Sequence, residues 1–176
     1  MRLALKLHPD STSAAASSVE VEVTRPRDSA LTLSYVVIGK ISLLRVPSVV
    51  ATARADGLWQ HTCFEVFLAV PPNAGYYEFN FSPSTQWAAY RFSGYRSGMQ
   101  VVSEIDAPSI EVSLSRDSYI LQVALDLDTA NVPRGTPWRL GLSAVIEETN
   151  GNKSYWALAH APGKPDFHHA DCFTHE

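Results

Sequence analysis

Apolar and polar residues alternate along much of this chain, and this pattern constrains the fold more than any other feature. The alternation is clearest in residues 2–7, 19–24, 31–35, 111–115 and 119–127. Successive side chains of a β-strand point to opposite faces, so alternation is typical of strands with one buried face. No stretch of twelve or more residues keeps the period of an amphipathic helix. We predict an all-β fold with about ten strands and little helix, arranged as a two-sheet antiparallel β-sandwich of the immunoglobulin-like or jelly-roll type.

Turn signals between these runs predict how the strands connect. Residues 116–118 separate two alternating runs and predict a hairpin, and Asn150-Gly151 predicts a second hairpin between residues 138–147 and 153–158. We expect residues 40–57 to form a loop or an irregular edge, because Pro47 would interrupt a central strand. The length of 176 residues favours a single domain over residues 1–176.

Composition excludes several classes of partner. The 14 basic residues are scattered and outnumbered by 18 acidic ones, so we expect no nucleic-acid partner. No run of about 18 apolar residues predicts a membrane span. The first residues lack the apolar region of a secretory signal, and Cys63 and Cys172 are too few for a disulfide framework. We therefore expect a cytoplasmic protein with reduced thiols, and the oligomeric state stays open.

One dense group of polar and aromatic residues lies in residues 76–96. Glu78 and Asn80 share one face of a predicted strand, and a return through residues 82–85 could bring Trp87 or Arg91 beside them. With Trp59 and Glu65, this set suits a sugar, because an indole stacks on a pyranose ring while polar groups bind its hydroxyls. The same residues also allow a structural interpretation. Arg91 could neutralise a buried glutamate, and the two tryptophans could pack in the core.

A second dense group lies in residues 155–173, within a loop broken by glycine and proline. It contains His160, Lys164, Asp166, His168 and Cys172. Histidine and cysteine can bind a divalent metal, but their spacing here matches no established zinc pattern. Alternatively, Asp166 and the histidines could lock the loop through hydrogen bonds to its backbone.

Three segments carry a family resemblance: WQHTCFEVFL, YYEFNFSPSTQWAAYRFSGYRSGM and WALAHAPGKPDFHHADCF. They resemble the bacterial DOMON-like proteins of the family-nine carbohydrate-binding-module-like superfamily. The resemblance implies a β-sandwich that binds its ligand at the sheet surface or between loops. Relatives bind sugars or haem. Haem-binding relatives use an axial methionine and histidine, for which Met99 with His160 or His168 is the available pairing.

We therefore predict a non-catalytic module that binds a small ligand, most plausibly a carbohydrate or amino sugar, without a resident cofactor. One alternative is a haem- or metal-binding protein. Another is an enzyme acting on a sugar derivative, with Glu65 and Glu78 as acid and base about 5 to 9 Å apart. The predicted ligand contacts are Trp59, Glu65, Glu78, Asn80, Trp87, Arg91, His160, Lys164, Asp166 and His168.

Overall fold

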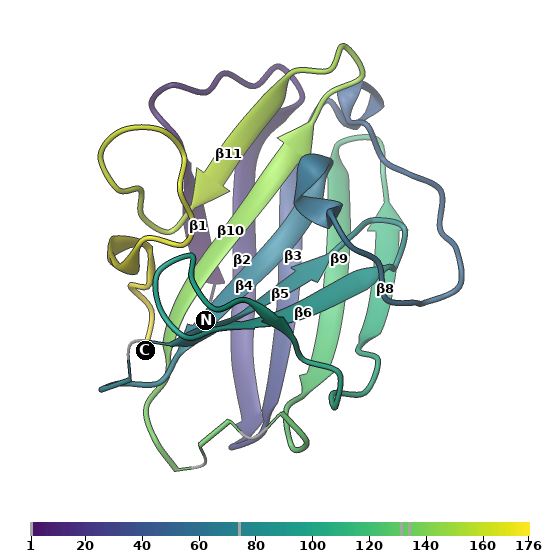
Figure 1. Ribbon diagram of the computed structural model, residues 1–176. Helices are drawn as coiled ribbons and strands as arrows, with labels where there is room; N and C mark the ends of the chain where they lie inside the picture. The colour runs from purple at the N-terminus through teal and green to yellow at the C-terminus, as the bar shows by residue number, and fades with distance from the viewer. Residues whose placement is uncertain (1, 74, 131, 134) are drawn as a thin grey trace.

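The computed structural model describes residues 2–73, 75–130, 132–133 and 135–176, and these residues form β-strands joined by loops and short 3-10 turns (Figure 1). The strands are β1 (Arg2–Leu7), β2 (Ala16–Arg27), β3 (Ala30–Gly39), β4 (Cys63–Ala69), β5 (Tyr76–Phe81), β6 (Trp87–Phe92), β7 (Gln100–Val101), β8 (Ser109–Leu114), β9 (Ser118–Asp126), β10 (Arg139–Glu147) and β11 (Lys153–Ala157). The 3-10 turns are η1 (Ile41–Leu43), η2 (Leu58–Gln60) and η3 (Ala170–Cys172). Within this part of the chain no helix is long and apolar enough to cross a membrane. The predicted all-β class with little helix is confirmed.

The eleven strands of the described residues form one antiparallel sheet rather than the two separate sheets predicted. The strand order is β7-β6-β5-β4-β10-β11-β1-β2-β3-β9-β8. The sheet curls, so that β10, β4, β5 and β6 lie in front of β2, β3, β9 and β8 in Figure 1. Strand β1 joins the two halves, because Arg2 to Leu5 pair with β2 whereas Lys6 and Leu7 pair with β11. The alternating pattern indicates which face of each strand is buried. It does not show that one strand, here β1, pairs with neighbours from both halves and so joins them into one sheet.

The main core lies between the two halves of the sheet. Val21 on β2, Leu33 on β3, and Phe64 and Phe79 on β4 and β5 are all fully or almost fully buried there. Across this core the Tyr35 hydroxyl donates a hydrogen bond of 2.6 Å to the backbone carbonyl of Glu65. The face of β4, β5, β6 and β10 that points into this core is called the inner face below.

The predicted hairpins are confirmed. Strands β8 and β9 pair through Leu114 and Tyr119, and β10 and β11 pair through Glu147 and Lys153. Gly151 in the second turn has a φ of 88°, a left-handed conformation that glycine adopts without the steric cost of a Cβ atom. Residues 40–57 contain only η1 and isolated bridges, as expected for a loop.

The opposite, outer face of β4, β5, β6 and β10 is also covered, by the C-terminal segment 158–176. Phe67, Tyr76 and Phe92 of the strands pack with Phe167 and Phe173 of this segment in a second apolar cluster. The segment is held close, because Leu140 and His175 exchange backbone hydrogen bonds of 2.7 and 3.2 Å. Strands β4 and β5 are therefore buried on both faces, which places polar side chains of the outer face inside the protein.

Candidate functional site

A cavity of about 430 Å³ lies between the outer face and the C-terminal segment. Its polar lining consists of Glu65, Glu78, Arg96 and His168. Its aromatic lining consists of Trp59, Tyr90, Phe92, Tyr155 and Phe167. Small-molecule sites usually have volumes of about 300 to 1,000 Å³, with apolar walls and a few polar groups. The cavity has the size and the lining of a site for a small ligand.

Glu65 and Glu78 form the floor of this cavity, and Asn80 lies beside them, outside the lining. Glu65 lies directly opposite Asn80 in the β4–β5 pair, so Glu65 and Glu78 are diagonal neighbours. In the usual strand geometry the Cα atoms of such neighbours are about 7 to 8 Å apart. Asn80 Nδ2 donates to Glu78 Oε1 at 2.8 Å, and the Ser143 hydroxyl donates to Glu65 Oε2 at 3.3 Å. Among the described residues, Glu65 Oε1 and Asn80 Oδ1 are buried acceptors without a hydrogen-bond partner.

Burial changes the acidity of both carboxyl groups. It raises the pKa of Glu65 well above its usual range, and the negative charge of Glu78 raises it further. Burial also raises the pKa of Glu78, although the hydrogen bond from Asn80 and the positive charge of Arg96 oppose this shift. Removal from water disfavours the charged form of both groups, and at Glu65 the like charge of Glu78 adds to this effect.

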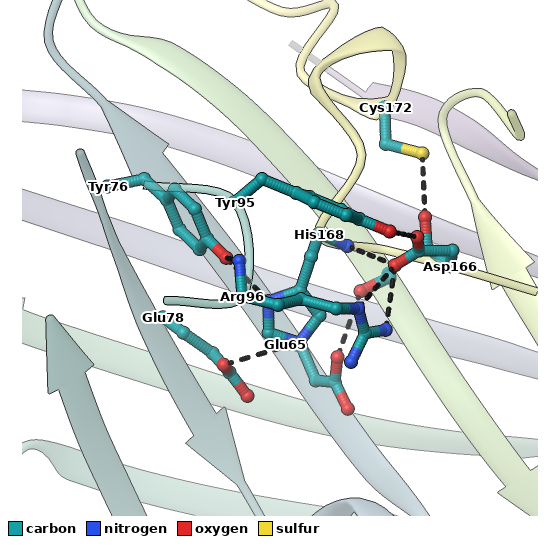
Figure 2. A network of polar contacts seen from close by, with 9 residues as sticks. Glu65, Tyr76, Glu78, Tyr95, Arg96, Asp166, His168 and Cys172 are labelled. Atoms are coloured by element: carbon teal, nitrogen blue, oxygen red, sulfur yellow. Dashed lines mark hydrogen bonds and ion pairs between the residues drawn. The ribbon is translucent and has the colours of Figure 1, made fainter. Parts of the chain in front are cut away.

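His168 connects the C-terminal segment to this floor (Figure 2). The backbone N–H of Arg96 donates to the Tyr76 hydroxyl at 3.2 Å, and that hydroxyl lies 2.8 Å from His168 Nδ1. We assign the tyrosine as donor to Nδ1, which leaves the proton of the neutral ring on Nε2, 3.7 Å from Glu78 Oε2. Burial, and then the charge of Arg96, lower the pKa of His168 to about 4. The ring is therefore neutral near pH 7.

Asp166 ties the C-terminal segment to the loop 93–99 through Arg96, which lines the cavity. One of its oxygens accepts from Arg96 Nε and Nη2 at 3.2 and 2.7 Å, and the Tyr95 hydroxyl donates to the other. The same carboxylate accepts from the backbone N–H of His168 at 3.2 Å. Burial raises the pKa of Asp166, but these bonds outweigh it and lower the pKa overall. The loop-locking interpretation of Asp166 is confirmed.

Aromatic side chains form the walls. Trp59 in η2 keeps 42% of its surface exposed, and its ring meets the edge of Tyr90 on β6 at a centroid distance of 6.4 Å. Tyr155 and Phe167 stand on β11 and on the C-terminal segment, with ring centroids 6.1 Å apart. The exposed indole offers a flat apolar surface next to the buried acceptors of the floor.

The structure brings only part of the predicted set together. Trp59, Glu65, Glu78 and His168 line the cavity, while Asn80 bonds to Glu78 and Asp166 bonds to Arg96.

Trp87 and Arg91 lie on the inner side of β6, so the expected contact with Glu78 or Asn80 is wrong. Glu78 pairs with Tyr90, and therefore the odd-numbered residues of β6 point the other way. Trp87 is buried in the main core with the guanidinium of Arg54 4.0 Å from its ring centre, as the core-packing alternative expected.

Two other predicted residues lie elsewhere. His160 donates from Nε2 to the Lys6 carbonyl at 2.8 Å and packs its ring against His8. Lys164 is exposed, and the cavity lining includes neither residue. In the part of the chain that the structure describes, no three His, Cys, Asp or Glu side chains are placed to hold a metal ion. The histidines of the tail thus form hydrogen bonds with different parts of the protein.

Sequence reasoning missed Arg96 and all of the aromatic lining except Trp59. Tyr90 had no usable signal, since a turn at 82–85 would pair Glu78 with residue 89, whereas five residues, 82–86, separate the paired Phe81 and Trp87 and place Tyr90 opposite Glu78. Arg96 had none, because its partner Asp166 is 70 residues away and local patterns do not report such contacts.

The chain matches no protein-family model, and no curated protein matches it in sequence. Its fold, however, is shared with solved structures. A putative carbohydrate-binding protein from Bacteroides uniformis aligns over 99% of this chain and 84% of its own, at 12% identity and a TM-score of 0.68. A family-nine carbohydrate-binding module from Caldicellulosiruptor kristjanssonii in complex with cellotriose aligns over 93% and 74%, at 12% identity and a TM-score of 0.57. The same type of module from that organism in complex with glucose aligns over 90% and 76%, at 13% identity and a TM-score of 0.51. This chain has the fold of family-nine carbohydrate-binding modules.

Proposed function

We propose that this protein is a non-catalytic carbohydrate-binding module whose sugar occupies the cavity on the outer face. The observation that carries the proposal is the placement of the exposed Trp59 indole beside the buried acceptors of Glu65 and Glu78 in a cavity of about 430 Å³. The indole would stack on the apolar face of a sugar ring, and the carboxyl groups would accept bonds from its hydroxyls. The shared fold with sugar-bound modules supports this choice of ligand.

The two glutamates are poorly arranged for glycoside cleavage. Such catalysis needs one carboxyl that keeps its proton and a second that stays ionised, so their environments must push the two pKa values apart. Here burial is the main influence on both groups, and it raises the pKa of each. The surroundings therefore disfavour the charged form of both groups, which favours binding over catalysis.

A haem with methionine and histidine ligands does not fit the donor groups. Met99 and His168 both line the cavity, as the haem alternative required. Yet His168 Nδ1 is bonded to the Tyr76 hydroxyl at 2.8 Å, and Nε2 faces Glu78 at 3.7 Å. Both ring nitrogens are directed at protein groups, so neither is free to bind a haem iron. We propose that the site works without a cofactor.

The direct test is isothermal titration calorimetry with glucose and cellotriose. Trp59→Ala should lower the affinity about 30-fold, since a central aromatic contact contributes about 2 kcal/mol or more. Trp59→Phe keeps part of the stacking surface, so its affinity should lie between those of the unchanged protein and Trp59→Ala. Leu114→Ala alters an exposed apolar residue on β8, in the other half of the sheet, and should bind like the unchanged protein.

Two results would contradict the proposal. One is the absence of binding to either sugar at millimolar concentration. The other is an affinity that responds equally to Trp59→Ala and Leu114→Ala, because the sugar would then not contact the indole.

A further inference from the structure

The floor of the cavity and the adjoining Asn80 contain buried acceptors without a donor. Glu65 Oε1 and Asn80 Oδ1 have no hydrogen-bond partner among the described residues, and their side chains are 2% and 0% exposed. Glu78 Oε2 lies 3.7 Å from His168 Nε2. Buried acceptors without donors are rare and costly, so either a proton on Glu65 or a hydrogen-bond donor of a ligand is needed here.

The charges around the floor point in the same direction. Of the described residues that line the cavity, Arg96 and His168 are the basic ones. Arg96 is engaged by Asp166 through two hydrogen bonds, and His168 carries no charge near neutral pH. Arg96 thus acts on Glu78 through its charge, while its ion pair is with Asp166. A positive charge placed between the two carboxyl groups of the floor would relieve their repulsion and favour their ionised forms.

The walls also suit a cation. Trp59 and Tyr90 meet edge to face beside the floor, and Tyr155 and Phe167 stand among the other lining residues. The faces of aromatic rings attract ammonium groups, most strongly where water is excluded.

We propose that the cavity selects sugars that carry a free, protonated amine over their hydroxyl and N-acetyl counterparts. The proposal rests on the carbohydrate-binding function above and names the ligand class of the same site. In the free protein, a proton on Glu65 can donate to Asn80 Oδ1, since the two residues are directly opposite in the β4–β5 pair. An ammonium group brings three donors and a full charge. It can replace that proton and bond to both carboxylates together.

The test is calorimetry near pH 6.5 with glucose, its 2-amino, 3-amino and 6-amino derivatives, and N-acetylglucosamine. A hydrogen bond to a charged group is stronger than a neutral one by an amount that corresponds to about 10- to 100-fold in affinity. At least one amino sugar should therefore bind at least tenfold more tightly than glucose. N-acetylglucosamine fills the same region without a charge and should show no such gain.

Variants test whether Glu65 and Glu78 produce the preference for an amine. Glu65→Gln and Glu78→Gln should each reduce the ratio of amino-sugar to glucose affinity towards one. Glu111→Gln, on exposed β8 in the other half of the sheet, should leave the ratio unchanged. Circular dichroism and a thermal melt confirm that each variant is folded, and the comparison of sugars on the unchanged protein needs no variant.

The outcomes separate the two proposals. Glucose and the amino sugars binding equally would overturn the amine selectivity and leave the carbohydrate-binding function standing. No binding by any sugar would overturn both. An amine preference that persists in both glutamine variants would show that the amine is recognised elsewhere, and it would also overturn the inference.

Discussion

Acidification should destabilise this protein through His168. Burial and the charge of Arg96 lower the pKa of this histidine to about 4 in the folded state, against 6.5 for the free side chain. The unfolded chain therefore binds the proton more readily. His168 contributes its full stabilisation above pH 6.5, and the contribution is lost as the pH falls towards 4.

The size of the effect follows from the two pKa values. At pH 5 the unfolded histidine is mostly protonated and the folded one mostly neutral. The linkage relation therefore gives a decrease of about 2 kcal/mol in the contribution of His168 to the free energy of unfolding between pH 7.5 and pH 5. For a domain of this size, that corresponds to a decrease in Tm of about 4 to 8 °C.

Glu65 and Glu78 act with the opposite sign over the same range. Their pKa values are raised by burial, so their contribution to stability is present at low pH and lost as the pH rises. The measured profile of the unchanged protein is a sum of both effects. A difference between variants is needed to isolate His168.

The assay is urea unfolding at pH 7.5 and pH 5 with His168→Asn, whose amide can still accept from Tyr76. The variant loses ring packing at both pH values. On acidification its free energy of unfolding should fall by about 2 kcal/mol less than that of the unchanged protein. His169→Asn is the matched control, because the side chain of His169 is 43% exposed and caps η3, a role that asparagine also fills. Parallel pH dependences for the unchanged protein and His168→Asn would refute the reasoning.

Two further predictions concern stability. Glu65→Gln should stabilise the protein at pH 8 by roughly 1 kcal/mol or more, because burial raises the pKa of Glu65 and the cost of that shift to folding grows as the pH rises above the usual range of a glutamate, and the gain should shrink at pH 5. Urea unfolding at both pH values checks this, and an equal gain at each would contradict it. Gly141→Ala should cost about 1 to 3 kcal/mol, because the new Cβ would lie 2.6 Å from Phe173 Cδ1. Thermal melts should show that this penalty largely disappears in a Phe173→Ala background, and an unchanged penalty there would exclude the clash as its cause.

Local periodicity predicted the features that depend on neighbouring residues. Alternation identified the strands and the shared face of Glu78 and Asn80, which the structure joins by a hydrogen bond of 2.8 Å. Turn residues identified the hairpin at Asn150-Gly151. Both signals are strong because strand geometry and turn conformation are set by residues a few positions apart.

Register was the first property that these signals did not supply. The hairpin between β5 and β6 was predicted, but Trp87 and Arg91 were placed on the face of Glu78, whereas the structure pairs Glu78 with Tyr90. A shift of one residue moves a side chain to the other face of the sheet. The same shift sent Trp87 into the main core and removed Arg91 from the cavity.

By itself, the sequence determined the all-β class, most strand positions and the polar face that became the floor of the cavity. Only the tertiary structure decided that this face would be closed. The C-terminal segment packs on it through Phe167 and Phe173, and Asp166 binds Arg96 across 70 residues of chain. The physical reason is that burial on the second face and ion pairing over such distances depend on how the chain returns in space. Local alternation carries no information about that return.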